Sequence, residues 1–189
     1  MKIHFLRHGR TDANERGLYY GATDLPLSEK GLKELVELKE TIDYPIAETY
    51  LASGLRRARQ SLNILYGREP ERMIAEFNEF DFGDFEMKSH DELKENPEYL
   101  RWIDGTAETC PGGESMNRFT ERILKGFEML RALESRSIVL VCHGGVIATL
   151  MDQLFPQQRE HYYAWIPDCG RGYTVEMSGG QPDACFPIE

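Results

Sequence analysis

Two histidines stand directly beyond short apolar runs, where strands of a sheet would end. His8 follows the run Lys2–Leu6 after a single arginine, and His143 immediately follows the run Ile138–Cys142. A histidine has an ordinary pKa of about 6.5, so its neutral ring can act as a nucleophile near neutral pH. Attack on a phosphate ester would also need cationic groups around the phosphoryl oxygens and an acid for the departing alkoxide.

Arginine is concentrated near the amino terminus of a chain that is acidic overall. The chain has 22 lysines and arginines against 32 aspartates and glutamates, a net charge of −10, whereas residues 1–60 carry 10 basic and 9 acidic side chains. The six arginines of this segment are Arg7, Arg10, Arg16, Arg56, Arg57 and Arg59. A guanidinium fits phosphate oxygens, whereas nucleic acids and anionic membranes require a broadly basic surface. The charge pattern favours a small anionic ligand and argues against nucleic acid or a membrane as partner.

Most other ways of handling phosphate leave sequence patterns that this chain lacks. It has no G-x-x-x-x-G-K-[ST] loop, no cysteine followed six positions later by arginine, and no D-x-D pair. The H-E-x-x-H pattern of zinc peptidases and the G-x-S-x-G pattern of serine hydrolases are also absent. Phosphoryl transfer through a histidine remains. For that chemistry His8 is the candidate nucleophile, Arg7 and Arg57 are candidate phosphate ligands, and His143 is a further donor.

The apolar runs predict a parallel sheet covered by helices. Continuous hydrophobic runs, without polar alternation, are typical of strands buried on both faces. The predicted strands are Lys2–Leu6, Thr49–Ala52, Arg72–Ala75, Ile138–Cys142 and Tyr173–Met177. One predicted helix begins after Ser28, which is its N-cap. Two more predicted helices cover the apolar stripes 55–65 and 116–130. Strands that alternate with helices indicate the α/β class, in which ligands bind beyond the carboxyl ends of the strands.

Length and composition fit one folded domain. The chain has 189 residues, of which 41% are hydrophobic, enough to build a core without disulfides or a structural metal. The domain is expected to span residues 1–189, with 78–113 as an irregular insertion over the active site, because Asn96-Pro97 and Pro111-Gly112-Gly113 interrupt that segment. The four cysteines lack C-x-x-C or zinc spacing, and no apolar run could span a bilayer, so we expect a cytoplasmic protein.

Four blocks of residues occur in a characteristic order along the chain. They are Leu6-Arg7-His8-Gly9 with Thr11, Asn14, Pro26-Leu27-Ser28 and Gly31; Ser53-Gly54-Leu55-Arg56-Arg57-Ala58; Asn78-Glu79-Phe80-Asp81-Phe82-Gly83-Asp84-Phe85-Glu86; and Cys142-His143-Gly144-Gly145-Val146. This ordered set resembles the histidine phosphatase superfamily, which includes the cofactor-dependent phosphoglycerate mutases, and it is far more specific than Arg-His-Gly alone. The resemblance implies a three-layer α/β/α sandwich with a mostly parallel central sheet, phosphoglycerate mutase-like, and no metal or other cofactor.

The resemblance also implies a role for each matched residue of the reaction. His8 would become transiently phosphorylated, while Arg7, Arg57 and His143 would bind the phosphoryl group. Glu79 would donate a proton to the leaving group and then recover one. The ligand implied is a small-molecule phosphate ester.

Three further positions bear on that substrate. Under the same resemblance, Asn14 contacts the edge of the phosphate and Gly144 lines its binding site. Members of the superfamily commonly have glutamate directly after Arg-His-Gly, whereas this chain has Arg10. The departure adds positive charge near the expected pocket and bears on which phosphate ester is bound.

Residues next to the four blocks narrow the resemblance. They are Ala13-Asn14 with Gly17-Leu18-Tyr19 and Gly21, then Phe82-Gly83-Asp84-Phe85-Glu86-Met87, and Gly112-Gly113-Glu114. These stretches are most similar to α-ribazole phosphatases, which implies a metal-independent phosphomonoesterase acting on α-ribazole 5′-phosphate in cobalamin nucleotide-loop assembly. The alternatives are a phosphatase for sugar phosphates or nucleotides, a phosphoglycerate mutase, and a catalytically idle phosphate-binding regulatory module. The oligomeric state, monomer or dimer, stays open.

Overall fold

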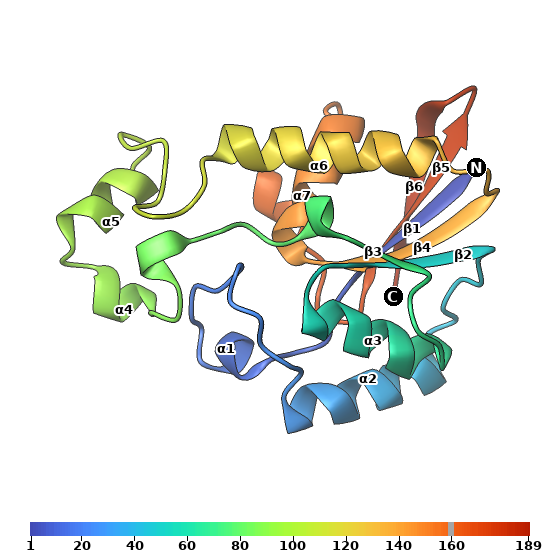
Figure 1. The fold of residues 1–189 in the computed structure, drawn as a ribbon, viewed down its shortest axis with the longest axis horizontal. Helices are drawn as coiled ribbons and strands as arrows, with labels where there is room; N and C mark the ends of the chain where they lie inside the picture. The colour runs from blue at the N-terminus through green and yellow to red at the C-terminus, as the bar shows by residue number, and fades with distance from the viewer. Residues whose placement is uncertain (159–160) are drawn as a thin grey trace.

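A six-stranded sheet forms the centre of the computed structural model, which describes residues 1–158 and 161–189 (Figure 1). The strands are β1 (Lys2–Arg7), β2 (Thr49–Ser53), β3 (Arg72–Ile74), β4 (Ser137–Cys142), β5 (Gly172–Ser178) and β6 (Gln181–Ile188). Their order is β3-β2-β4-β1-β5-β6, in which the first four are parallel and β5 is antiparallel to both of its neighbours, β1 and β6. The sheet is therefore mostly parallel, and every predicted strand is present with ends that differ by at most one residue.

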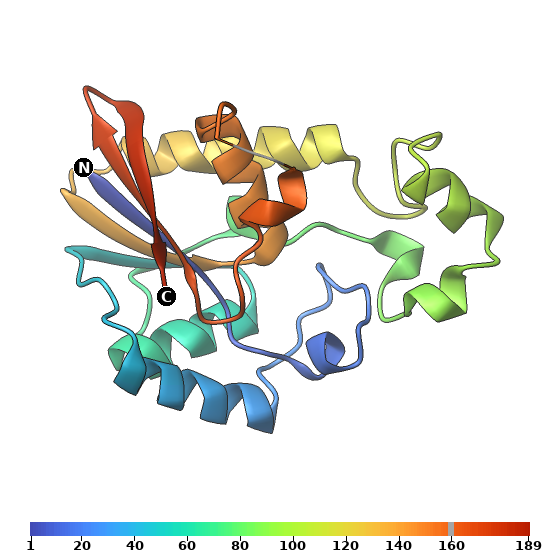
Figure 2. The ribbon, with the colours of Figure 1, turned by 180° about the vertical axis from the view of Figure 1, so that it is seen from behind.

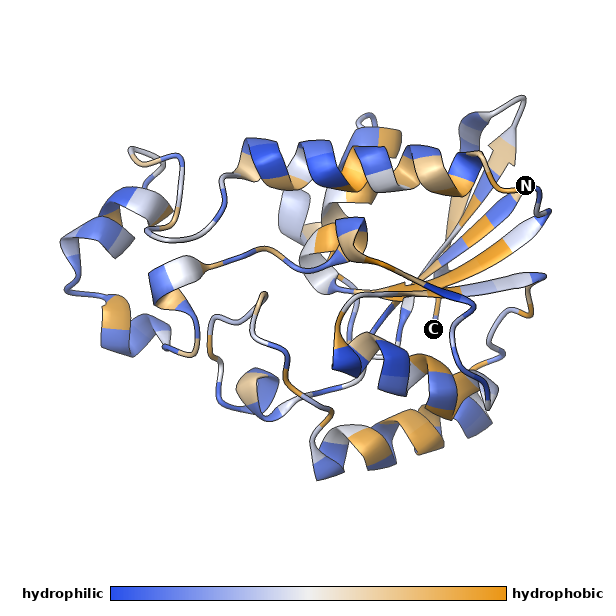
Figure 3. Ribbon diagram, viewed as in Figure 1, coloured by the Kyte–Doolittle hydropathy of each residue, from blue (hydrophilic) through white to orange (hydrophobic). Residues whose placement is uncertain are grey.

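Helices cover both faces of the sheet, which makes the three-layer α/β/α sandwich. α2 (Glu29–Thr41) and α3 (Arg56–Tyr66) cover one face, and α6 (Met116–Arg131) and α7 (Gly144–Leu154) cover the other (Figures 1 and 2). α2, α3 and α6 carry hydrophilic and hydrophobic residues on different sides, as Figure 3 shows. Within the described residues, no helix combines the length and apolar character needed to cross a membrane.

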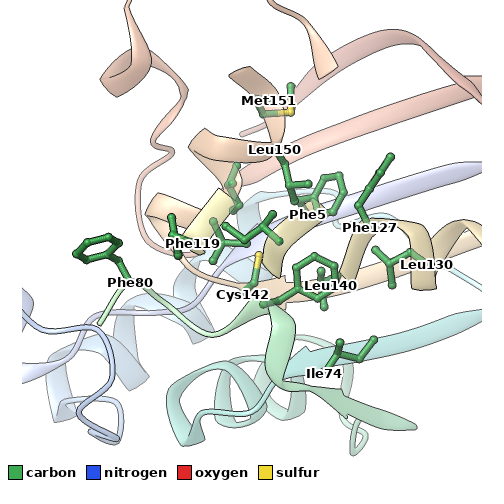
Figure 4. Close-up of a cluster of buried hydrophobic side chains, with 14 of the residues drawn as sticks. Phe5, Ile74, Phe80, Phe119, Phe127, Leu130, Leu140, Cys142, Leu150 and Met151 are labelled. Atoms are coloured by element: carbon green, nitrogen blue, oxygen red, sulfur yellow. The ribbon is translucent and has the colours of Figure 1, made fainter. Parts of the chain in front are cut away.

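Side chains of the central strands alternate between two hydrophobic cores. Phe5 of β1 and Leu140 of β4 pack with α6 and α7, in the core that Figure 4 shows. Leu6 and Val141, one residue later on each strand, pack with α2 and α3 instead. Because both faces are covered, consecutive positions of these strands are buried and mostly apolar, which explains the nearly continuous hydrophobic runs in the sequence.

The sequence pattern does not reveal two elements. β6 lies at the edge of the sheet and contains Pro182 and Pro187, which suit an edge but obscure a strand pattern. α7 is buried over most of its surface, so it has no polar side and shows no amphipathic stripe. The predicted stripe on α6 is also too long by one residue, since Met116 is exposed in the first turn.

The segment 78–113 contains short helices and an aromatic cluster. Its elements are η2 (Gly83–Phe85), α4 (His90–Leu93) and α5 (Pro97–Ile103), and the other short elements are α1 (Asp12–Glu15), η1 (Ala75–Phe77) and η3 (Tyr162–Trp165). Figures 1 and 2 show α4 and α5 at the end of the molecule away from the amino terminus. Tyr19, in the loop after α1, contacts Phe82, Tyr99 and Trp102 with ring centroids 5.3, 5.7 and 5.9 Å away. Aromatic packing thus joins this segment to the loop that follows α1.

Gly126 allows α6 to pack closely on the segment that leads to Glu79. A Cβ at this position would lie 2.9 Å from the ring of Phe77 and 2.9 Å from the Glu76 Cβ. We expect Gly126→Ala to lower the free energy of unfolding by about 1–3 kcal/mol, because Phe77 is fully buried, even though alanine favours a helix by about 1 kcal/mol. Urea unfolding measures the difference. Glu121→Ala, on the exposed side of α6, is the control, and a stability gain in Gly126→Ala would contradict the packing argument.

Candidate active site

The carboxyl ends of β1 and β4 bring His8 and His143 together. Arg7 lies opposite Cys142 in the parallel register, so each histidine directly follows one of two paired strand ends. The backbone N–H of His8 donates to the Cys142 carbonyl at 3.0 Å, and the two imidazole centroids are 5.1 Å apart. Both rings are buried. Strand pairing therefore creates this pair from residues that are far apart in the sequence.

His8 is held with its Nε2 atom available for attack. Its Nδ1 atom lies 2.6 Å from the Gly9 carbonyl oxygen, which can only accept a hydrogen bond. Nδ1 must therefore carry the proton, and Nε2 keeps a lone pair in the neutral ring. Burial, followed by the positive charges of Arg57 and Arg7, lowers the pKa of His8 well below its ordinary value. The neutral, nucleophilic form is thus the stable one at neutral pH.

His143 is oriented by a serine at the end of the next strand. Its Nε2 atom lies 2.7 Å from Ser53 Oγ, and that oxygen accepts the backbone N–H of Leu55 at 3.4 Å. Nδ1 is buried and has no partner in the described part of the chain. When the Ser53 hydroxyl donates to Nε2, the ring proton lies on Nδ1, which then becomes a donor. Burial, followed by the charge of Arg57, lowers the pKa of His143 as well.

Arg57 reaches the site from the first turn of α3. Its side chain is completely buried, with Nη1 donating to the Thr23 carbonyl at 2.9 Å and Nη2 to the Gly21 carbonyl at 2.7 Å. The guanidinium carbon lies 4.8 Å from the centroid of the Tyr20 ring, a cation–π contact. Arg57 therefore does not belong to a solvated basic face of α3.

Arg7 crosses the start of α7 from the end of β1. Its Nη1 atom donates to the Pro167 carbonyl at 2.8 Å. A Cβ on Gly144 would lie 3.2 Å from both the Cζ and Nε atoms of Arg7, so a glycine allows this close approach. His143 is the N-cap of α7, and the positive end of the helix dipole therefore adds to the charge of Arg7.

Three buried nitrogen atoms of Arg7, Arg57 and His143 have no hydrogen-bond partner among the described residues. Of the five buried side-chain polar atoms without partners in residues 1–158 and 161–189, three are Arg7 Nε, Arg57 Nε and His143 Nδ1. The His143 ring lies 5.1 Å from the His8 ring, and the charges of both arginines contribute to the lowered pKa of both histidines, so the two guanidinium groups lie near this pair. An unsatisfied buried donor costs about 1–3 kcal/mol, so this set favours an anion with several oxygens. Among the same residues, no three His, Cys, Asp or Glu side chains are grouped as a metal site requires.

Glu79 approaches the site from the β3 side of the sheet. Its Oε2 atom accepts the backbone N–H of Gly145 at 2.9 Å, and its Oε1 atom accepts that of Phe80 at 2.9 Å. Gly145 belongs to the first turn of α7, the same helix end that Arg7 crosses. These two bonds orient the carboxyl group beside the proposed anion site.

Asn14 and Arg10, both near His8 in the sequence, have different partners in the structure. Asn14 Oδ1 accepts the Tyr20 hydroxyl at 2.7 Å and the Thr11 backbone N–H at 3.0 Å, as part of the α1 capping box. Its Nδ2 atom is the end left to meet a phosphate. Arg10 Nε donates to Glu34 Oε2 at 3.0 Å, so its positive charge is balanced on α2.

Two supporting residues have no role that the sequence pattern identifies. Ser53 lies inside the second block but is recognisable only once β2 is seen beside β4. Glu86 accepts the backbone N–H groups of Gly21, Ala22 and Thr23 at 2.8, 3.0 and 3.2 Å. It thereby fixes the loop whose carbonyls bind Arg57. A carboxylate that lies close to a glycine-containing loop only after folding leaves no signal in sequence spacing.

The lowered pKa of His8 can be tested by NMR, which follows the ionisation of each histidine ring as the pH changes. We expect the rings of His8 and His143 to remain neutral as the pH falls through 6.5, because burial and two arginines disfavour protonation. Arg57→Gln removes a positive charge, so the pKa of His8 should rise. The control Arg59→Gln alters an exposed arginine that is paired with Glu69 at 2.6 Å. This variant should leave the pKa of His8 unchanged. An unaltered His8 titration in Arg57→Gln would contradict the proximity of these two groups.

Several known proteins are similar to this chain. Residues 3–184 match the family model for the histidine phosphatase superfamily (branch 1). The adenosylcobalamin/alpha-ribazole phosphatase of Salmonella typhimurium is 33% identical over 160 residues, which cover 82% of this chain and 79% of that protein. The crystal structure of the alpha-ribazole phosphatase from Shigella flexneri has a TM-score of 0.85 at 26% identity, over 96% of this chain and 93% of that chain. A phosphoglycerate mutase structure from Thermus thermophilus has a TM-score of 0.74 at 26% identity, with both chains fully covered. With nearly its whole length matched by the family model, the chain belongs to branch 1 of the histidine phosphatase superfamily.

Proposed function

We propose that this protein is a phosphomonoesterase that hydrolyses α-ribazole 5′-phosphate through a phosphorylated His8. The observation that carries the proposal is the set of buried donors without acceptors, from Arg7, Arg57 and His143, around a ring whose Nε2 has a free lone pair. A phosphoryl group supplies the several oxygens that these donors lack. The name of the Salmonella typhimurium relative, adenosylcobalamin/alpha-ribazole phosphatase, supports the choice of ester.

In the first step, His8 Nε2 attacks phosphorus and the bond from phosphorus to the ester oxygen breaks. Arg7, Arg57 and His143 donate to the three other phosphoryl oxygens, where charge is redistributed in the transition state. Glu79, as the carboxylic acid, gives its proton to the departing 5′-oxygen, so the nucleoside leaves as an alcohol.

In the second step, water hydrolyses the phosphorylated His8. Glu79, now a carboxylate, takes a proton from the water molecule as its oxygen attacks phosphorus and the phosphorus–nitrogen bond breaks. Inorganic phosphate leaves, His8 is again neutral, and Glu79 is again protonated. The proposal assigns no step to a metal, because the two arginines supply the positive charge.

The proposal places the nucleoside base on the side of segment 78–113. Glu79 must lie next to the leaving group, and the segment begins one residue before it. The half-buried rings of Tyr19, Phe82 and Trp102 provide faces on which an aromatic base can stack. In this proposal the segment forms the cover of the site. The four cysteines are free thiols, which fits a reducing cytoplasm.

Rapid-quench experiments with α-ribazole 5′-[³²P]phosphate test the proposal. A single turnover quenched in alkali should leave an acid-labile label on His8, because covalent catalysis divides the displacement into two steps. The value of kcat/KM for this ester should exceed that for ribose 5-phosphate by about tenfold or more, equivalent to about 1.4 kcal/mol of transition-state binding to the base. His8→Ala is the control and should show neither label nor turnover.

Other outcomes distinguish the alternatives. Similar kcat/KM values for sugar phosphates, nucleotides and α-ribazole 5′-phosphate would indicate a general phosphatase. Interconversion of 3- and 2-phosphoglycerate would indicate a mutase. Phosphate binding without turnover would indicate a regulatory module, and a label on a residue other than His8 would exclude the mechanism.

Glu79→Gln removes the proton donor while nearly preserving its shape. We expect the rate of His8 phosphorylation by α-ribazole 5′-phosphate to fall by about 10²–10⁴, the usual contribution of a general acid. The rate with p-nitrophenyl phosphate should change much less, because p-nitrophenolate leaves without a proton. Asp81→Asn and Glu86→Gln are controls for the leaving-group dependence alone, since Glu86 also holds the loop that binds Arg57 and its loss should slow both esters alike. If one of these controls shows the dependence on the leaving group and Glu79→Gln does not, the acid is that neighbour.

A further inference from the structure

The geometry points to the ion pair of Arg122 and Glu114 as the element that positions Glu79 for proton transfer. This inference rests on the proposed function, because it takes Glu79 as the acid. Neither residue belongs to the set of donors that the proposed reaction assigns to the phosphoryl oxygens. Both act through the backbone on the two sides of Glu79.

Arg122 binds the chain that leads into Glu79 by three carbonyl oxygens. From α6, its Nη1 atom donates to the carbonyls of Glu76 at 2.9 Å and Asn78 at 2.8 Å, and its Nη2 atom donates to the carbonyl of Glu79 at 3.2 Å. The planar guanidinium presents its N–H groups in a rigid fork, which a lysine ammonium lacks. A single side chain therefore sets the path of residues 76–79.

Glu114 fixes both Arg122 and the chain that leaves Glu79. Its carboxylate accepts Nη2 and Nε of Arg122 at 2.5 and 3.2 Å, and it also accepts the backbone N–H of Asp81 at 3.0 Å. The Glu114 N–H donates to the Asp81 carbonyl at 3.0 Å. The side chains of Arg122 and Glu114 are only 27% and 15% exposed, so solvent screens this pair less than the surface pairs of the molecule.

The acid is thus held between two fixed elements. Its backbone is bound to α6 through Arg122, and its carboxyl group is bound to α7 through the Gly145 N–H. Phe80, the next residue, packs on Phe119 with ring centroids 5.3 Å apart, at the edge of the core shown in Figure 4. Proton transfer needs a separation of about 2.6–3.2 Å between the acid and the leaving oxygen, so a small backbone shift removes it.

Lys125 provides a matched control on the same helix. It lies one turn beyond Arg122, and its Nζ atom is 3.2 Å from the Glu76 carboxylate. It therefore contacts a side chain of the same segment and no carbonyl of residues 76–79 in the described structure. Its side chain is 72% exposed, so its removal tests loss of a positive charge without loss of the backbone contacts.

The experiment compares rates of His8 phosphorylation by α-ribazole 5′-phosphate and p-nitrophenyl phosphate in Arg122→Gln, Arg122→Lys, Glu114→Gln and Lys125→Gln. The rate ratio between the two esters reports the acid, whereas the p-nitrophenyl phosphate rate reports the amount of folded, active enzyme. In Arg122→Gln the ratio should fall about tenfold or more, because misplacement by about 1 Å can cost 10²-fold. Glu114→Gln and Arg122→Lys should lower the ratio less, and Lys125→Gln should leave it unchanged.

A double variant separates positioning from general support of the fold. Once Glu79→Gln has removed the proton, adding Arg122→Gln should lower the ratio no further. Equal slowing of both esters in Arg122→Gln, Arg122→Lys and Glu114→Gln, with a selective loss in Glu79→Gln alone, would overturn the inference and leave the proposed function intact. The absence of a selective loss in Glu79→Gln would instead overturn the acid assignment, and this inference with it.

Discussion

The parallel pairing of β1 with β4 is the constraint on which the whole site depends. With Arg7 opposite Cys142, His8 and His143 emerge side by side at one edge of the sheet. A slip of one residue would turn these side chains to opposite faces. β2 and β3 continue the parallel series, so Ser53 and the segment that carries Glu79 arrive at the same edge.

The partners of the arginines distinguish those that face the site from those that do not. Arg7 and Arg57 donate to backbone carbonyls, which orient a guanidinium without cancelling its charge. Arg10 and Arg59 are paired with carboxylates and have little charge to offer a ligand. Burial, followed by the charges of Arg57 and Arg7, lowers the pKa of His8 and keeps that ring neutral. In the proposed reaction, one arrangement therefore prepares both the nucleophile and the donors for the phosphoryl group.

Much of this organisation is encoded in local sequence. Runs of mostly apolar residues without polar alternation predict the parallel strands because both sheet faces are covered, and the α6 stripe reflects one buried side. The four ordered blocks identify the superfamily and lead to His8, Arg57 and Glu79, since a reaction needs these residue types beside strand ends. β6 and α7 escape prediction, one because prolines obscure an edge strand and the other because burial on all sides removes its period.

Only the tertiary structure decided which atoms are left without partners at the candidate site and what holds them. The sequence names His8, but the Gly9 carbonyl determines that Nε2 is the free nitrogen. It shows Arg10 next to the first histidine, but packing against α2 turns that charge to Glu34. Arg122 is 43 residues from Glu79 and binds its carbonyl only because α6 crosses that segment. Such hydrogen bonds join distant residues through directional contacts, which leave no periodic pattern in the chain. The amino-acid order thus determines the helices, the strands and the chemical groups that they carry. Their packing determines the tautomer of His8, the unpaired donors and the position of Glu79.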